Sequence, residues 1–319
     1  MTYNVCIMNN SKILNGNVVV TAGSTYLDID AYACMVAMAE LLNLKGECAI
    51  AYSNAPGNYS ICDFLVEKGK ISNEFSCDIQ SENIKYIIVD VSDPEFLKNS
   101  VPLDNIVEIY DHHVGFEEYW TSRIGRNAHI EFIGAAATLI YREWKRAGLV
   151  SKMSQNTALL LIAAILDNTL NLTSANTMNE DVAAFKELCQ RFDIGAEWCA
   201  EYFRSVQENI ESDLKNALFK DLKTVYNNDI LPPKFAQLCV WDAVSVLDRL
   251  SEIRIYFSEL SEKYMINIID IKHGCSYFVC DCDKCQRKIE KIFNVRFESD
   301  VAKTNTAYLR KEIIKKTLS

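Results

Sequence analysis

The chain has 319 residues, of which 49% are hydrophobic and 24% charged, a composition typical of a globular protein with about two domains. Its formal net charge of −10 argues against a general nucleic-acid-binding protein, which would usually be basic. The N-terminus lacks the basic-then-apolar pattern of a signal peptide, and no apolar run has the length of a membrane span. We therefore expect a cytoplasmic protein without a membrane partner, and we expect its cysteines to be reduced thiols.

The first part of the chain alternates short apolar runs with helical patterns. The predicted strands cover residues 18–21, 47–52, 86–90, 106–111 and 129–133. The predicted helices cover residues 31–45, 60–68, 135–147 and 157–166. This alternation predicts an α/β fold with a mostly parallel sheet flanked by helices. In such sheets, ligands gather beyond the carboxyl ends of the strands.

A long, charged helical stretch over residues 181–222 follows, and we expect it to carry a linker. Beyond it, strands are predicted over 234–240, 264–271 and 277–282, and helices over 247–263 and 286–293. These elements predict a second, smaller α/β domain. The predicted division is an N-terminal domain of residues 1–195, a helical linker of residues 196–215 and a C-terminal domain of residues 216–319.

Acidic residues and adjacent histidines stand at the ends of the predicted elements of the first domain. They are Asp28, Asp30, Asp90, Asp111, His112, His113 and Asp167. Carboxylates combined with imidazole bind divalent ions such as Mn²⁺ or Mg²⁺. Each residue also has an ordinary interpretation, because Asp often caps helices or forms turns and His is often a partly buried residue. Their gathering at four element ends of one domain favours a metal site.

Four short segments carry a family resemblance. Asp28-Ile29-Asp30, Val89-Asp90, Asp111-His112-His113 and Leu166-Asp167 occur in the order of the four motifs of the DHH phosphoesterase superfamily, which the chain resembles over nearly its whole length. The resemblance implies two metal ions per site, Mn²⁺ or alternatively Mg²⁺ or Co²⁺.

The resemblance also implies a role for each residue of this set. Asp90 would bridge the two ions, and Asp28 would bind one of them. The other ion would be bound by Asp30, His112 and Asp167. Asp111 would orient a ligand and His113 would lie near the substrate, where a metal-activated water attacks phosphorus.

The second domain carries a further resemblance. Arg310 and Lys311 occupy the matching places of the Ser-Arg-Lys-Lys ending of family II inorganic pyrophosphatases, and Asp221-Leu222-Lys223 resembles that family's other lysine segment. The resemblance implies that Lys223, Arg310 and Lys311 bind phosphate together with His113, in a cleft between the domains. Solvated surface charge is the ordinary alternative.

This type of second domain is shared by family II pyrophosphatases, exopolyphosphatases and prune proteins. The nuclease branch of the superfamily carries a Gly-Gly-His segment, whereas this chain has only His273-Gly274. The resemblance therefore implies an enzyme, a metal-dependent phosphohydrolase that cleaves phosphoanhydride bonds of pyrophosphate or short polyphosphate.

One departure concerns Ser24, which stands where family II pyrophosphatases place a histidine, four residues before the first motif aspartate. It puts strict pyrophosphatase activity in question and leaves two alternatives open: a small-nucleotide phosphatase or phosphodiesterase, and a non-catalytic prune-like binding protein. The expected partner is a small anionic phosphate compound and not a nucleic-acid duplex. A homodimer stays open.

Four cysteines lie close together in the second domain. Cys275, Cys280, Cys282 and Cys285 form a C-x4-C-x-C-x2-C run, and four thiolates could hold a structural zinc. The spacing differs from the usual zinc knuckle, and free cysteine is also a common small core residue. The core interpretation is the one that the pattern favours.

Overall fold

The computed structural model describes residues 17–23, 27–66, 71, 84–260 and 262–318. The chain divides into two compact units, unit 1 over Met1–Ala196 and unit 2 over Glu197–Ser319. Ser24 and part of the helix predicted over 60–68 lie outside the described residues. Among the described helices, none is long and apolar enough to cross a lipid bilayer.

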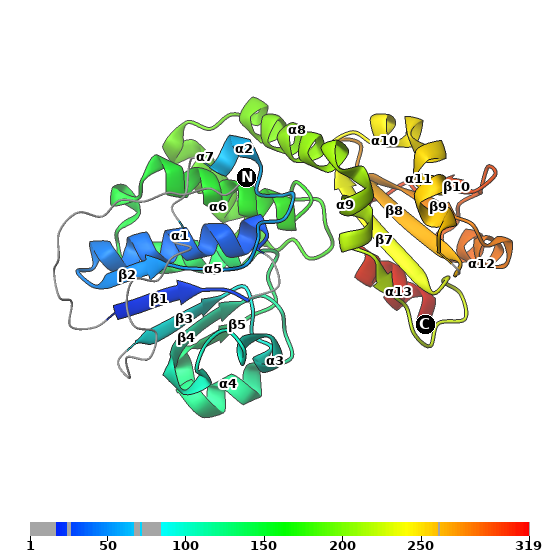
Figure 1. The fold of residues 1–319 in the computed structure, drawn as a ribbon. Coiled ribbons are helices and arrows are strands. Elements are labelled where there is room, and N and C mark those ends of the chain that lie inside the picture. Colours follow the sequence, from blue (N-terminus) through cyan, green and yellow to red (C-terminus); the bar gives the residue numbers. More distant parts are fainter. Residues whose placement is uncertain (1–16, 24–26, 67–70, 72–83, 261, 319) are drawn as a thin grey trace. The chain divides into compact units, whose positions relative to one another are not determined.

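Unit 1 contains a sheet of five parallel strands in the order β2-β1-β3-β4-β5 (Figure 1). The strands are β1 (Asn17–Thr21), β2 (Cys48–Ala51), β3 (Lys85–Val89), β4 (Ile106–Asp111) and β5 (Ala128–Ile130). Val18 to Val20 and Tyr86 to Val89 are buried, as expected for apolar strands that are covered on both faces. The predicted parallel α/β architecture is confirmed, and all five strands end at one edge.

Helices cover both faces of this sheet (Figure 1). On one face, α1 (Ile29–Leu44), α5 (Ala136–Arg146) and α6 (Gln155–Asn168) pack against one another, and α7 (Asn179–Phe192) packs against α6. α1 is buried on nearly every side, which explains why its sequence is apolar all round. On the other face, α3 (Pro94–Leu97) and α4 (Glu117–Ile124) bury Leu97 and Trp120 against the strands. The short α2 (Asp63–Val66) follows β2.

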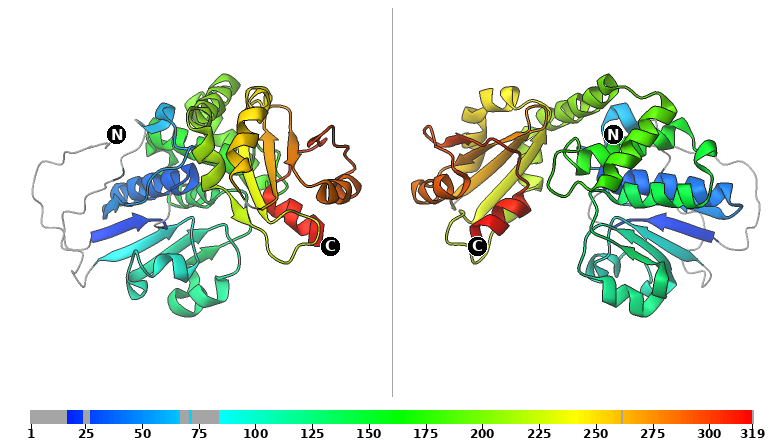
Figure 2. Two further views of the ribbon diagram at one scale, coloured as in Figure 1. Left: turned by 45° about the vertical axis from the view of Figure 1, so that its right-hand side comes forward. Right: turned by 180° about the vertical axis from the view of Figure 1, so that it is seen from behind.

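Unit 2 contains a second five-stranded sheet in the order β10-β9-β8-β7-β6, in which only β7 and β8 run parallel (Figure 2). Its strands are β6 (Lys223–Thr224), β7 (Lys234–Val240), β8 (Tyr264–Asp270), β9 (Cys275–Cys280) and β10 (Val301–Lys303). Its helices are α8 (Ala196–Ser212), α9 (Leu214–Lys220), α10 (Val244–Asp248), α11 (Leu250–Ser258), α12 (Asp283–Phe293) and α13 (Arg310–Leu318). The predicted smaller α/β domain is confirmed as a fold class.

Two predicted helices are interrupted in the structure. The stretch 181–222 forms three helices, because Asp193 adopts a left-handed backbone (φ 54°) that ends α7, and α9 starts anew after Asp213. The stretch 247–263 forms α10 and α11, which meet at Arg249. α8 lies entirely within the predicted linker, and all of it except Ala196 belongs to unit 2.

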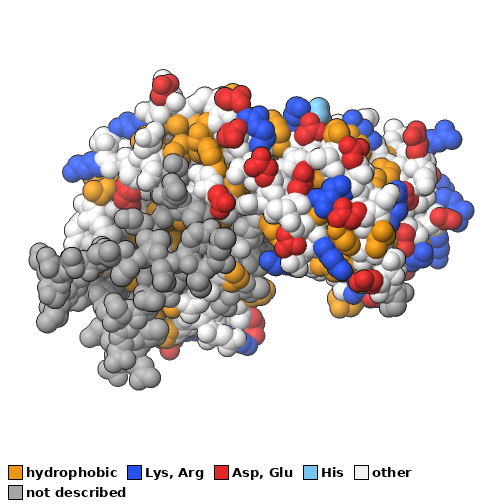
Figure 3. All heavy atoms as spheres, turned by 45° about the horizontal axis from the view of Figure 1, so that its top comes forward, with side chains coloured by type: hydrophobic (Ala, Val, Ile, Leu, Met, Phe, Trp, Pro, Cys, Tyr) orange, Lys and Arg blue, Asp and Glu red, His pale blue; other side chains and the backbone are white. Residues whose placement is uncertain are grey.

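The surface of unit 2 mixes charges of both signs. On the face drawn in Figure 3, Lys and Arg side chains alternate with Asp and Glu side chains over this unit. Ion pairs within unit 2 include Arg254 with Asp300 and Lys272 with Asp242. Within the described residues on this face, no broad field of positive charge is present that would attract a polyanion.

Candidate metal centre

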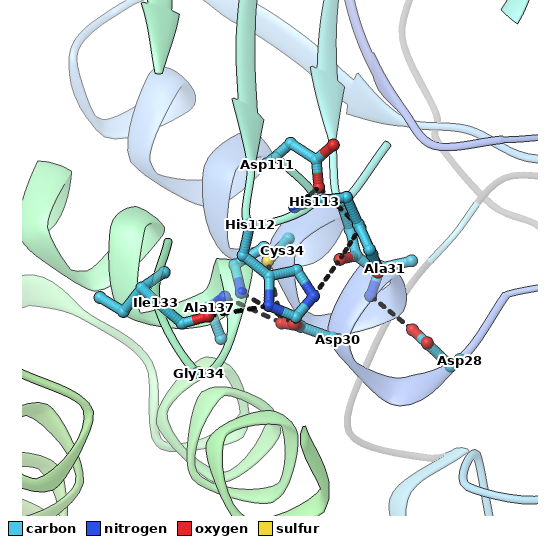
Figure 4. A network of polar contacts seen from close by, with 12 residues as sticks. Asp28, Asp30, Ala31, Cys34, Asp111, His112, His113, Ile133, Gly134 and Ala137 are labelled. Carbon is cyan, nitrogen blue, oxygen red and sulfur yellow. Dashed lines mark hydrogen bonds and ion pairs between the residues drawn. The ribbon is translucent and has the colours of Figure 1, made fainter. Parts of the chain in front are cut away.

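The carboxyl edge of the unit 1 sheet gathers the predicted acids and histidines (Figure 4). Asp90 follows β3, His112 and His113 follow β4, and the segment 131–135 follows β5. Asp28 and Asp30 stand at the start of α1, which comes after β1. The parallel order of the strands thus brings together residues that are up to 85 positions apart in the sequence.

Asp28 and Asp30 each cap a helix. Asp28 is partly buried, and its Oδ1 accepts a hydrogen bond from the Ala31 backbone N–H at 3.0 Å. Asp30 is fully buried, and its two oxygens accept the backbone N–H groups of Ala136 and Ala137, each at 2.8 Å, in the first turn of α5. Burial, reinforced by the charge of Asp28, raises the pKa of Asp30 to about 8.

Asp90 lowers the stability of the fold more than any other described group at this edge of the sheet. Its backbone is left-handed (φ 59°), and its Oδ1 is buried without a hydrogen-bond partner among the described residues. Burial, followed by the charges of Asp28, Asp30 and Asp111, raises its pKa well above the usual range. The left-handed backbone and the unpaired buried oxygen of Asp90 both lower the stability of the fold. Such features are found at functional sites, and they indicate that this oxygen binds a ligand.

His112 presents a lone pair to these carboxylates. Its Nδ1 lies 3.1 Å from the carbonyl oxygen of Ile133, which only accepts, so Nδ1 carries the proton. Burial and the neighbouring His113 lower the pKa of the ring and keep it neutral. Nε2 therefore carries a lone pair, and it lies 3.4 Å from Asp90 Oδ1 and 4.0 Å from Asp30 Oδ2.

This geometry fits a divalent cation. A lone pair that faces two carboxylates at 3.4 and 4.0 Å is repulsive by itself, and a cation between them turns the repulsion into coordination. The second ring nitrogen is already anchored to a backbone carbonyl, as is usual for a metal-binding histidine. One imidazole and several carboxylates make a donor set that suits manganese.

Asp111 orients His113. The buried Asp111 accepts both the backbone N–H of His113 at 3.0 Å and its Nδ1 at 2.9 Å, through Oδ1. Burial raises the pKa of Asp111, but these hydrogen bonds outweigh it and leave the pKa lowered. The same contact raises the pKa of His113, whose side chain is 64% exposed. His113 therefore faces solvent beside the candidate metal ligands.

The predicted set is brought together only in part. Among the described residues of unit 1, the ligand atoms of Asp90, His112 and His113 lie within 4.8 Å of one another, and Asp30 lies 4.0 Å from His112. Asp28 is close enough to raise the pKa of both Asp30 and Asp90. Asp167 lies in the last turn of α6, which packs against α1, but outside that compact group. The ligand roles of Asp28, Asp30, Asp90, His112 and Asp167 all stay predictions.

One residue outside the predicted set supports the site. Asp181 is fully buried, and its Oδ2 accepts the backbone N–H groups of Gly134 (2.9 Å) and Met178 (2.8 Å). Its Oδ1 accepts the Thr138 hydroxyl at 2.6 Å. Asp181 thereby fixes the segment whose Ile133 carbonyl holds His112. Its position three residues into α7 is a typical capping place, and this signal could have drawn attention to it.

The predicted phosphate-binding residues of unit 2 differ in how exposed their side chains are and in whether they are already paired. Lys223 on β6 and Lys311 on α13 are exposed, although partial desolvation lowers the pKa of Lys311. The Arg310 guanidinium is 15% exposed and forms a two-pronged ion pair with Asp221, Nη1–Oδ2 at 2.7 Å and Nη2–Oδ1 at 2.9 Å. Arg310 thus anchors the segment that leads into Lys223. Its contact with phosphate stays a prediction.

Sequence relatives span nearly the whole chain. No protein-family model matches it. The manganese-dependent inorganic pyrophosphatase of Bacillus subtilis is 24% identical over 312 residues, which cover 89% of this chain and 92% of the relative. A probable manganese-dependent inorganic pyrophosphatase of Bacillus velezensis matches with the same identity and coverage.

Solved structures share the fold. A putative family II inorganic pyrophosphatase of Methanococcus jannaschii superposes with a TM-score of 0.64 at 17% identity, over 95% of this chain and all of that one. An exopolyphosphatase-related protein of Bacteroides fragilis gives a TM-score of 0.51 at 14% identity, over 95% of this chain and 91% of that one.

The chain resembles manganese-dependent inorganic pyrophosphatases over nearly its whole length, and it shares the fold of a family II inorganic pyrophosphatase. These relatives confirm the predicted resemblance to the family II inorganic pyrophosphatases. Of the acids and histidines in the four motifs, Asp30, Asp90, His112 and His113 lie close together at the carboxyl edge of unit 1.

Proposed function

We propose that this protein is a manganese-dependent hydrolase of the phosphoanhydride bond in pyrophosphate or short polyphosphate. The observation that supports this most directly is the buried, unpartnered Asp90 oxygen, 3.4 Å from the unprotonated Nε2 of His112. The relatives that carry the name manganese-dependent inorganic pyrophosphatase support the choice of ion and substrate.

In this proposal the site holds two ions. Asp90 would be a ligand of both, Asp28 of one, and His112 with Asp30 and Asp167 of the other. When bound, manganese neutralises phosphate charge and lowers the pKa of a water to about 7. Asp111 keeps the ring of His113 pointing outward, so that His113 donates a hydrogen bond or a proton to a phosphate oxygen. Lys223 and Lys311 supply point charges for the remaining phosphate oxygens, and Arg310 is a further candidate for that role.

The direct test is orthophosphate release from four substrates. Pyrophosphate, tripolyphosphate, long-chain polyphosphate and a nucleotide panel would each be assayed with Mn²⁺, Mg²⁺, Co²⁺ or a chelator. We expect metal-dependent release from pyrophosphate or tripolyphosphate. Nucleoside products from the panel alone would instead favour a nucleotide phosphatase or phosphodiesterase. Manganese binding without any hydrolysis would favour a non-catalytic, prune-like protein.

Replacing His113 should separate turnover from metal binding. Because His113 is exposed and is held through Asp111, we expect His113→Gln to lower kcat by about 100-fold or more while the manganese stoichiometry stays unchanged. Isothermal titration with Mn²⁺ and initial-rate assays would measure the two quantities. A variant that loses manganese would show that His113 is a ligand and not a proton donor.

Replacing Lys311 should affect substrate affinity. A charge-assisted hydrogen bond contributes about 1.5–3 kcal/mol, so Lys311→Ala should raise the KM for pyrophosphate roughly 10- to 100-fold and leave manganese affinity unchanged. Lys291→Ala is the matched control, because Lys291 is an exposed lysine on α12 of the same unit. Equal KM values for the two variants would remove Lys311 from the proposed site.

A further inference from the structure

Three thiols gather where β9 passes into α12. Cys280 ends the strand and is fully buried, Cys282 is partly exposed, and Cys285 lies 9% exposed in the first turn of the helix. Cys280 Sγ lies 3.8 Å from the carbonyl oxygen of Cys282. The proposed phosphate chemistry makes no use of these thiols.

Cys275 does not belong to this cluster. It opens β9, five residues before Cys280, and a strand rises by about 3.3 Å per residue, so the two residues are roughly 16 Å apart. A tetrahedral zinc needs four ligands about 2.3 Å from the ion. The four cysteines of the C-x4-C-x-C-x2-C run therefore cannot hold one zinc together, and the three remaining thiols need another explanation.

Cys282 and Cys285 are linked by the helix start itself. Cys282 is the N-cap of α12, and its sulfur accepts the backbone N–H of Cys285 at 3.4 Å. α12 has 11 residues, so its amino end is a fully formed helix terminus. Burial, followed by contact with the Cys282 sulfur, raises the pKa of the Cys285 thiol to about 12.

This arrangement divides two chemical roles. The capping sulfur is the thiol that solvent can reach, and the backbone N–H of Cys285 points at it. The Cys285 sulfur is protonated and buried, and it lies about one helical turn from Cys282. A Cys-x-x-Cys pair that joins a strand to a helix is the arrangement used by dithiol redox sites.

We propose that Cys282 and Cys285 form a reversible disulfide by exchange with a low-molecular-weight disulfide such as oxidised glutathione. The Cys282 thiolate attacks one glutathione sulfur, so that a mixed disulfide forms and one glutathione thiolate leaves. Cys285 then loses its proton to that thiolate and attacks the Cys282 sulfur, which releases the second glutathione. The two protein thiols are oxidised, and one glutathione disulfide is reduced to two glutathione molecules.

The test uses the full-length protein and peptide mapping. The protein would be equilibrated with glutathione buffers of graded oxidation, acid-quenched, alkylated and digested with trypsin without reduction. Trypsin cuts after Lys272, Lys284 and Arg287, so Cys282 and Cys285 fall into different peptides, 273–284 and 285–287. We expect these two peptides to become cross-linked, and we expect dithiothreitol to separate them.

Two variants assign the bond. Cys282→Ser should abolish the cross-link and keep the fold, because serine is itself a good N-cap, and thermal unfolding would verify this. Cys280→Ser should leave the cross-link intact. Four results would each overturn the proposal: no oxidation at all, a lasting glutathione adduct on Cys282, a loss of two hydrogen masses within peptide 273–284 alone, or a cross-link that survives in Cys282→Ser.

Discussion

Replacing Asp90 by asparagine should abolish metal-dependent hydrolysis and at the same time stabilise the metal-free protein. Changes next to metal ligands already cost about 10- to 100-fold in activity, so loss of a bridging carboxylate should cost more than about 100-fold. Asparagine removes the negative charge, which repels Asp28, Asp30 and Asp111, and it tolerates the left-handed backbone (φ 59°). We expect the free energy of unfolding without metal to rise by about 1–3 kcal/mol.

Two measurements check this pair of opposite effects. Chelated wild type and Asp90→Asn would be compared by thermal unfolding, and both would then be titrated with Mn²⁺. Manganese should raise the melting temperature of the wild type far more than that of the variant. Asp104→Asn serves as the control because Asp104 is 90% exposed in the same unit. Near-normal hydrolysis in Asp90→Asn would contradict the assignment of Asp90 as a ligand.

Adding one methyl group at Gly134 should damage the site without touching a ligand. A Cβ at Gly134 would lie 2.5 Å from Asp181 Oδ2 and 2.7 Å from Thr169 Cγ2. Both neighbours are fully buried, so the backbone of Gly134 must move, and the Ile133 carbonyl that orients His112 moves with it. We expect Gly134→Ala to lose about 1–3 kcal/mol of stability and to bind manganese about 10- to 100-fold more weakly.

Gly195→Ala is the matched control for this substitution. A Cβ at Gly195 would meet no atom within 4 Å, and its backbone needs no positive φ. Its stability should stay within about 0.5 kcal/mol of the wild type, and its manganese affinity should not change. If Gly134→Ala behaved like this control, the segment 133–135 would not position His112.

The sequence was most informative where patterns are local and repeated. Apolar runs such as Val18 to Val20 predict strands because burial on both faces allows no polar residue. The alternation of strands and helices then predicts a parallel sheet and places Asp90 and His112 at one edge. The helix breaks at Asp193 and Arg249 were not predicted, because a charged residue at either position is also compatible with a continuous helix.

The site's supports could not be predicted, because they depend on contacts between distant segments. Asp30 looks like a capping residue of its own helix, but its oxygens hold α5, more than 100 positions away. Arg310 and Asp221 are 89 positions apart, and nothing local indicates that they pair. Asp181 likewise reaches back 47 positions to Gly134. Such pairings depend on the tertiary fold, and the spacing of residues in the sequence does not predict them.

We propose that manganese held at the carboxyl edge of unit 1 is required for pyrophosphate hydrolysis. The most direct test is the initial rate of orthophosphate release from pyrophosphate by chelator-stripped protein, measured as Mn²⁺ is added back. We predict no release before addition and a saturable rise with manganese that Asp90→Asn lacks. Release that is equally fast without metal, or manganese binding that restores no release from pyrophosphate, would contradict the claim.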